Sequence, residues 1–230
     1  MKIIGLQKLT LLDFPGHTAC TVFTPGCNLR CPFCHNGGVV IPDRDTQYYT
    51  EDEIFAFLKK RAGVLDGVAV TGGEPLLQPD IGEFLKKVRE LGYKVKLDTN
   101  GAYPERLRAL LEAGLVDYVA MDIKNSKEKY PVTAGIDDLD VEPFIESIGI
   151  IKTLAPDYEF RTTVVAEFHE TADIKAAAEM MGKVKAYYLQ SYKESDNMLL
   201  GGCSAVSEET LFEMAETAGK ITETCRVRGV

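Results

Sequence analysis

The chain has 230 residues, of which 45% are hydrophobic and 27% charged, and its formal net charge is −9. This composition is ordinary for a globular protein, and the acidic balance argues against nucleic acid as the main partner. No run of 18 apolar residues occurs, so no membrane span is expected. The N-terminus lacks the apolar stretch of a signal peptide. Six cysteines without such a signal indicate a reducing cytoplasm rather than a disulfide framework.

Short apolar, β-branched segments alternate with longer helical patterns from residue 18 to about residue 220. The expected strands are Thr18–Phe23, Val68–Thr71, Lys94–Leu97, Tyr118–Met121, Phe160–Val165 and Ala186–Leu189. Helices are expected after a capping box at Thr50, after a cap at Asp80 and from Pro104, and over about residues 141–154, 171–181 and 207–219.

This alternation implies right-handed β-α-β units, and therefore an α/β fold with a buried parallel sheet. Periodicity alone does not distinguish an open doubly wound sheet from a closed or partial barrel, although six units are fewer than the eight of a full barrel. No repeat, low-complexity tract or linker interrupts the pattern. Residues 1–230 are therefore expected to form one domain, in which the part from about residue 207 is the least clearly assigned.

Polar motifs directly follow four of the expected strands. A cysteine loop at residues 24–36 follows the first strand and Thr71–Pro75 follows the second, while Leu97–Gly101 and Met121–Lys124 follow the third and fourth. The carboxyl ends of parallel strands meet at one rim, where such folds bind their ligands. We therefore expect these motifs to form a single site.

The cysteine loop carries Cys27, Cys31 and Cys34 in a C-x3-C-x2-C arrangement. Three close thiolates can hold an iron–sulfur cluster and leave one iron without a protein ligand, whereas fully bound clusters take four. A zinc site needs a fourth ligand at matching spacing. His35 directly follows Cys34, so the two would reach one tetrahedral ion only with strain. The cysteines therefore favour a cluster with an open coordination position.

The loop, with Phe33 before its third cysteine, resembles the cluster-binding signature of radical S-adenosylmethionine (SAM) enzymes. Gly72–Pro75 is similar to their G-G-E-P element. The D-T-N-G and D-x-K patterns resemble the subgroup that activates glycyl radical enzymes. Within that subgroup the chain looks most like activating proteins of anaerobic ribonucleoside-triphosphate reductase, on the motifs Leu11–Gly16, Asp98–Gly101, Met121–Lys124, Phe160–Thr163 and Tyr188–Gln190.

The resemblance implies a partial (β/α)6 barrel, open on one side, with a [4Fe–4S] cluster and SAM as cofactors. Cys27, Cys31 and Cys34 are then the cluster ligands, and SAM chelates the open iron. The implied cofactor-binding residues are Phe33, Gly72, Gly73, Glu74, Asp98, Asn100, Asp122, Lys124, Arg161 and Gln190. In this resemblance the glycine turn and Glu74 hold the SAM amine, Lys124 pairs with its carboxylate, and the aspartates contact the ribose or a nearby cation.

The implied activity is the activation of a partner enzyme. A flavodoxin- or ferredoxin-type reductant supplies one electron, SAM is cleaved, and the resulting radical removes hydrogen from a backbone glycine of the partner. The resemblance favours anaerobic ribonucleotide reductase as that glycyl radical enzyme. Tyr192 and Lys193 stand where pyruvate formate-lyase activators carry a histidine, which disfavours pyruvate formate-lyase.

Several alternatives stay open. Arg161 can contact the ligand or form a salt bridge. Gln190 can contact the ligand or be a hydrogen-bonded polar residue at the end of its strand. His35 can tune the potential of the cluster or pack within the loop. The same core also serves small-molecule enzymes similar to 7-carboxy-7-deazaguanine synthase. A non-catalytic electron carrier or metal-binding module would use Cys203 or Cys225 as a fourth ligand.

Overall fold

The computed structural model describes residues 1–195 and 197–230, and its core is one eight-stranded sheet in the order β1 to β8. Strand β1 is antiparallel to β2, and every later neighbouring pair is parallel. The strands are β1 Gly5–Thr10, β2 Ala19–Thr24, β3 Gly67–Gly72, β4 Lys94–Thr99, β5 Tyr118–Asp122, β6 Tyr158–Val164, β7 Tyr187–Ser191 and β8 Cys225–Arg228.

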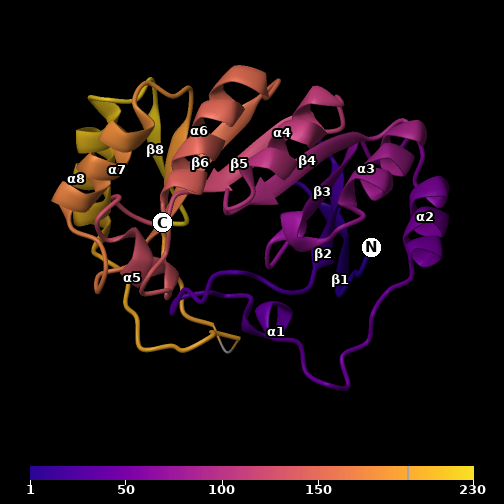
Figure 1. Cartoon of the computed structure of the whole chain (residues 1–230), viewed down its shortest axis with the longest axis horizontal. Helices are drawn as coiled ribbons and strands as arrows, with labels where there is room; N and C mark the ends of the chain where they lie inside the picture. The colour runs from indigo at the N-terminus through magenta and orange to yellow at the C-terminus, as the bar shows by residue number, and fades with distance from the viewer. Residues whose placement is uncertain (196) are drawn as a thin grey trace.

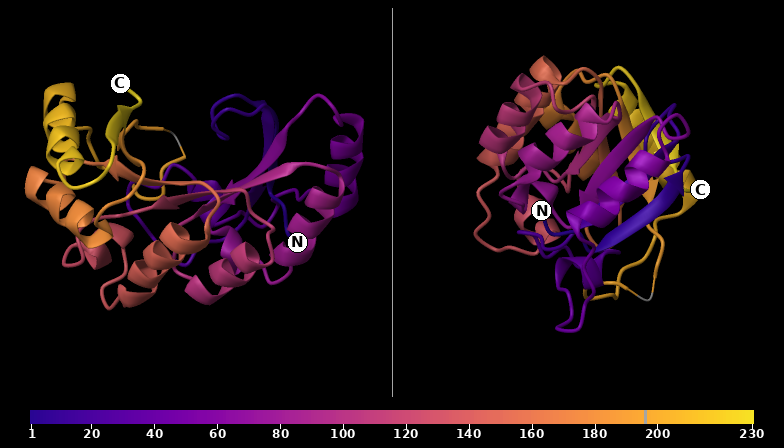
Figure 2. Two further views of the ribbon diagram at one scale, coloured as in Figure 1. Left: turned by 90° about the horizontal axis from the view of Figure 1, so that it is seen from above. Right: turned by 90° about the vertical axis from the view of Figure 1, so that its right-hand side faces the viewer.

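Helices connect these strands and cover the convex side of the curved sheet (Figures 1 and 2). They are α1 Gly37–Val40, α2 Glu51–Lys60, α3 Ile81–Glu90, α4 Pro104–Glu112, α5 Tyr130–Ala134, α6 Glu142–Leu154, α7 Thr171–Met181 and α8 Glu208–Gly219, with a 3-10 turn at Pro75–Leu77. The short α1 and α5 lie instead beyond one end of the strands (Figure 1). The α/β class and the partial barrel are confirmed.

Local signals account for the helix positions. The side chain of Thr50 accepts from the backbone of Glu53 at 3.2 Å, and the Glu53 carboxylate accepts from the Thr50 backbone at 2.8 Å. This capping box satisfies two amides that the start of α2 would otherwise leave unpaired. Acidic residues in the first turn and lysines in the last complement the helix dipole. The six expected helices and six expected strands are all present, with their ends shifted by a few residues.

The sequence analysis missed both edges of the sheet. Strand β1 has a largely exposed pattern, and β8 is only four residues long with one exposed arginine. Both segments lie outside the alternating pattern that the sequence shows from residue 18 to about residue 220. Neither segment has the continuous apolar run of a strand buried on both faces, because each edge strand pairs with a single neighbour.

The loop between β1 and β2 closes the barrel at the amino ends of the strands. Phe14 is 1% exposed and forms a small apolar cluster with Ala19, Tyr118 and Ala120. A side chain at Gly67 would meet the Phe14 ring at 2.7 Å, so the ring fills the space that this glycine leaves. Phe14 thus forms the floor of the barrel, opposite the rim that carries the polar motifs, while Leu11 and Leu12 of the same Leu11–Gly16 motif are exposed. None of the described helices is long and apolar enough to cross a membrane.

Candidate active site

A pocket of about 270 Å³ lies at the carboxyl ends of the parallel strands. Every residue that the sequence predicts for the site lines this pocket, except Glu74. The other lining residues are Leu29, His35, Asn36, Val40, Thr71, Thr99 and Thr163. The four polar motifs, which are far apart in the chain, are therefore neighbours in the fold.

The cluster loop packs backbone to backbone on the turn that follows β3. Gly73 N donates to Thr24 O at 3.0 Å, and Glu74 N donates to Gly26 O at 2.8 Å. A Cβ at Gly73 would lie 1.9 Å from Gly26 O, and one at Gly72, whose φ is +130°, would lie 2.2 Å from Thr24 O. The two glycines are therefore required to dock the cysteine loop, as well as to leave open space on the pocket side.

The three cysteines of the loop share one wall of the pocket. Cys31 is buried, while Cys27 and Cys34 are half-buried, and all six cysteines of the chain are free. Burial raises the pKa of the Cys31 thiol to about 11, and the nearby Lys124 ammonium acts in the opposite direction. Among the described residues, no three His, Cys, Asp or Glu side chains converge closely enough for a single metal ion. Thiolates are the side chains that hold iron–sulfur clusters.

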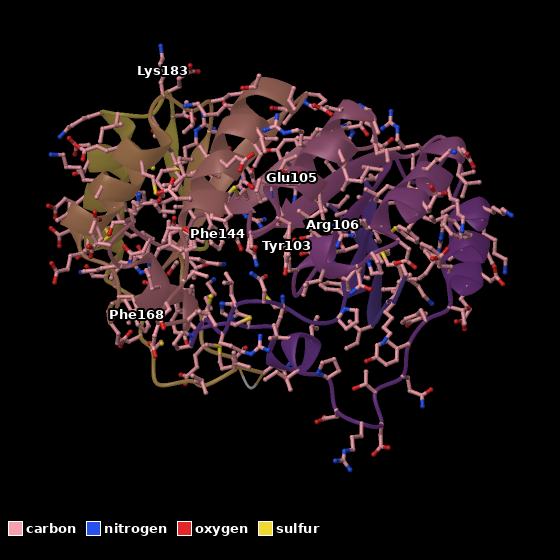
Figure 3. All side chains as sticks on the ribbon, viewed as in Figure 1. Tyr103, Glu105, Arg106, Phe144, Phe168 and Lys183 are labelled. Carbon is pink, nitrogen blue, oxygen red and sulfur yellow. The ribbon has the colours of Figure 1, made fainter. Side chains whose placement is uncertain are left out.

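Phe33 joins the cysteine loop to the segment after β6. Its ring lies 5.9 Å from that of Phe168, which Figure 3 labels, and 6.4 Å from that of His169. His169 Nε2 is 2.7 Å from Lys124 O, and its Nδ1 accepts from Val165 N at 3.1 Å. These contacts fit the neutral ring that donates through Nε2, and burial lowers the pKa of His169. His169 thus supports both Phe33 and Lys124.

Glu74 lies behind the pocket wall and does not line it. Its side chain is fully buried, with Oε1 accepting from Leu76 N at 2.9 Å and from Thr99 Oγ1 at 2.8 Å, and Oε2 accepting from Asn100 N at 2.6 Å. Burial raises the pKa of Glu74 to about 7, and these hydrogen bonds oppose the rise. The expected contact between this carboxylate and the ligand therefore has no support here. Instead, Glu74 holds the turn that carries Asn100.

Five charged side chains form a chain of alternating sign, and all of them except Lys96 line the pocket. Lys96 pairs with Asp98, and Arg161 reaches Asp98 at 3.4 Å and Asp122 at 2.9 Å, while Lys124 reaches Asp122 at 3.1 Å. Burial would raise the pKa of Asp122, but the two cations beside it hold the pKa at about 2. Burial also acts on Asp98, and Lys96 and Arg161 outweigh it, so its pKa is lowered as well. Both carboxylates are therefore charged at neutral pH.

The sequence analysis missed Lys96 although its signal was present. Lys96 and Asp98 are two residues apart in β4 and so lie on the same face of that strand. Lys96 is only 2% exposed, which is unusual for a lysine unless it is paired. The sequence left both a salt bridge and a ligand contact open for Arg161. The side chain makes a salt bridge to Asp122 and also lines the pocket.

The far wall of the pocket comes from β6 and β7, where Thr163 is in register with Gln190. The segment that follows β7 then packs on the cysteine loop. Leu199 N donates to Cys34 O at 3.0 Å, and the rings of Tyr192 and His35 are 5.7 Å apart. No local pattern in the sequence indicates this long-range contact, which was not expected.

The model of the radical SAM superfamily matches residues 21–181, and the chain belongs to this family. Enzymes of this family use a [4Fe–4S] cluster and SAM, so the expected class and cofactors are confirmed. The matched residues run from β2 into α7 and include both the cysteine loop and the buried charge chain.

Relatives with assigned names agree with the expected subgroup. A Methanocaldococcus jannaschii protein named for the activation of glycyl-radical enzymes is 31% identical over 198 residues, which cover 84% of this chain and 81% of that protein. The pyruvate formate-lyase-activating enzyme of Clostridium pasteurianum is 30% identical over 65% of each chain. The 7-carboxy-7-deazaguanine synthase of Methanopyrus kandleri is 32% identical over 48% of this chain and 51% of its own.

Solved structures share the fold. Streptococcus suis SuiB, solved with its precursor peptide SuiA, superposes on 91% of this chain with a TM-score of 0.69 and 16% identity. The chain spans about half the length of SuiB, 48%. At this identity the likeness concerns architecture alone.

Proposed function

We propose that Cys27, Cys31 and Cys34 hold a [4Fe–4S] cluster with one open iron, and that SAM binds beside it in the same pocket. The observation that carries this proposal is the composition of one pocket, where three thiols lie with Asp122 and Lys124 at the ends of neighbouring strands. Soft sulfur donors suit iron–sulfur clusters. Charged groups on the neighbouring wall suit a zwitterionic ligand. The donor set therefore fits the family's cofactors.

In this proposal Lys124 pairs with the SAM carboxylate, and Asp98 and Asp122 face its ribose hydroxyls or a cation. Gly72 and Gly73 present backbone to the ligand, and Phe33, Arg161, Asn100 and Gln190 complete the walls. The three cysteines would hold a cluster which, once reduced by an external donor, would supply one electron to SAM; methionine would be released, with a radical that can take hydrogen from a glycine. The protein's own part is to orient SAM and exclude water. The partly buried ion pairs keep the carboxylates charged and fixed before SAM arrives.

We further propose that the glycine belongs to a partner enzyme, so that the chain is a glycyl-radical enzyme activase. Two matched relatives carry names of that activity, and the first of them covers most of the chain. The small-molecule synthase matches only about half. The partner that we propose is anaerobic ribonucleoside-triphosphate reductase, because the five motifs together resemble its activating proteins. The reductant that we propose is a flavodoxin or ferredoxin. Six free thiols suit a reducing, cytoplasmic setting.

An anaerobic mixing experiment tests the activase proposal. The reconstituted chain, SAM and a reductant are incubated with purified anaerobic ribonucleotide reductase, and in parallel with pyruvate formate-lyase. Electron paramagnetic resonance should show a glycyl radical on the reductase and none on the lyase. A reductase variant with its radical glycine replaced by alanine is the control. A radical on the lyase alone would reassign the partner, and a radical on neither would exclude both partners.

Cysteine replacement separates the activase from an electron carrier. Cys203→Ser and Cys225→Ser should leave the iron and sulfide content unchanged, because neither residue lines the pocket. Replacement of Cys31 by serine should abolish cluster loading. Loss of the cluster in either of the first two variants would indicate a fourth protein ligand and a closed site.

A further inference from the structure

The sulfur of Cys27 accepts two N–H hydrogen bonds. Leu29 N donates to Cys27 Sγ at 3.4 Å, and the side-chain amide of Asn100 donates to it at 3.7 Å. In the described part of the chain, the hydrogen bonds include no such donor to the sulfur of Cys31 or Cys34. Burial raises the pKa of the Cys27 thiol, and the Leu29 hydrogen bond opposes that rise. The three candidate ligands therefore differ in their surroundings, and Cys27 is the one whose sulfur accepts N–H hydrogen bonds.

The Asn100 amide is held in one orientation by its neighbours. Its oxygen accepts from Ala102 N at 2.9 Å, which directs the NH2 group the other way. That group donates to Asn28 Oδ1 at 2.8 Å and has its second hydrogen for Cys27. Asn100 is also 6% exposed, so water competes little for the amide.

Glu74 in turn fixes the backbone of Asn100. Its Oε2 accepts from Asn100 N at 2.6 Å, while Oε1 is occupied by Leu76 and Thr99. Burial of a carboxylate destabilises the folded protein unless hydrogen bonds replace the lost water. The Glu74 side chain has no exposed surface, and both of its oxygens accept hydrogen bonds. The arrangement explains why a glutamate at the glycine turn faces the protein interior. It positions an amide against the cluster loop.

We propose that Asn100, positioned by Glu74, raises the reduction potential of the cluster by donating an N–H bond to the Cys27 thiolate. This inference rests on the proposed function, since it requires the cluster to be bound by the three cysteines. Reduction adds negative charge that spreads onto the sulfur ligands. A hydrogen bond to sulfur therefore stabilises the reduced cluster more than the oxidised one. Asn100 thus makes the cluster easier for a cellular reductant to reduce.

The test is a redox titration of the anaerobically reconstituted holoenzyme, followed by electron paramagnetic resonance. Asn100→Ala should shift the midpoint to a more negative potential, so that the ratio of reduced to oxidised cluster at one solution potential falls several-fold. Asn36→Ala is the matched control. Asn36 is an amide on the same pocket that donates to Gly72 O at 3.1 Å, not to a sulfur. Its potential should equal that of the wild type.

Asn100→Asp provides a second, nearly isosteric variant should the alanine variant fail to retain its cluster. It removes the N–H donor and adds negative charge, so its midpoint should also fall. A midpoint unchanged in both Asn100 variants, or an equal fall in Asn36→Ala, overturns the inference while leaving the proposed function intact. A wild-type chain that loads no [4Fe–4S] cluster overturns both.

Discussion

Replacement of Asp98 by asparagine should destabilise the cofactor-free protein strongly. Asp98 is the described ion-pair partner of Lys96, whose side chain is 2% exposed. Loss of one member of a buried pair leaves an uncompensated charge and costs about 3 to 5 kcal/mol. Asp98 is 16% exposed, and Arg161 keeps its second partner, Asp122, when Asp98 is replaced. The lower end, about 3 kcal/mol, is therefore expected. Lys96→Met/Asp98→Asn should recover most of this loss, because no unpaired ammonium remains.

Urea unfolding of the apoprotein at pH 7.5 measures these differences, and an unchanged m-value indicates that the unfolding transition is comparable. Lys185→Met is the matched control, since Lys185 and Asp157 form an ion pair at 2.6 Å whose side chains are about half exposed. It should produce no measurable loss. The reasoning is refuted if Asp98→Asn costs less than about 1 kcal/mol, or if the double variant is as unstable as the sum of its single changes.

Three other predictions follow from packing and burial. Gly73→Ala should prevent cluster loading, because the new Cβ would lie 1.9 Å from Gly26 O. Iron and sulfide content measures the loading. The control Gly38→Ala should load normally, because a Cβ there would meet nothing within 4 Å. Phe14→Ala should lower the free energy of unfolding in urea by about 3 to 5 kcal/mol without changing cluster loading at the cysteine loop. A loss below about 1 kcal/mol would contradict the role of Phe14 as the barrel floor. Burial lowers the pKa of His169. As the pH falls, this histidine is therefore protonated in the unfolded state before it is protonated in the folded state. The free energy of unfolding should therefore decrease as the pH falls below about 6.5, the ordinary histidine value. His169→Gln should weaken this dependence, and an identical pH profile in the variant would show that another group causes it.

The sequence predicts the central strands and the rim of the site well, for physical reasons. Strands buried on both faces have continuous apolar runs, such as Val68–Thr71 and Tyr118–Met121. Their carboxyl ends share one rim in any parallel sheet, so the motifs that follow them meet whatever the exact closure of the barrel. The cysteine spacing needs no tertiary information at all.

The remaining features depend on contacts that a linear pattern does not carry. Strands β1 and β8 are stabilised by pairing with one neighbour rather than by an apolar run. The direction of the Glu74 carboxylate is set by the Thr99 hydroxyl and the Asn100 backbone amide, 25 and 26 residues away in the chain. His169 reaches Lys124 across 45 residues. Residue type alone therefore suggested a ligand contact for Glu74 and gave no sign of the contact between His169 and Lys124.

The central claim is an open iron at the three-cysteine site that cleaves SAM. The most direct measurement is the formation of 5′-deoxyadenosine by the anaerobically reconstituted chain with SAM and dithionite. The account predicts that the wild type forms 5′-deoxyadenosine and that Cys31→Ser forms none. A fully loaded cluster that yields no 5′-deoxyadenosine would contradict it.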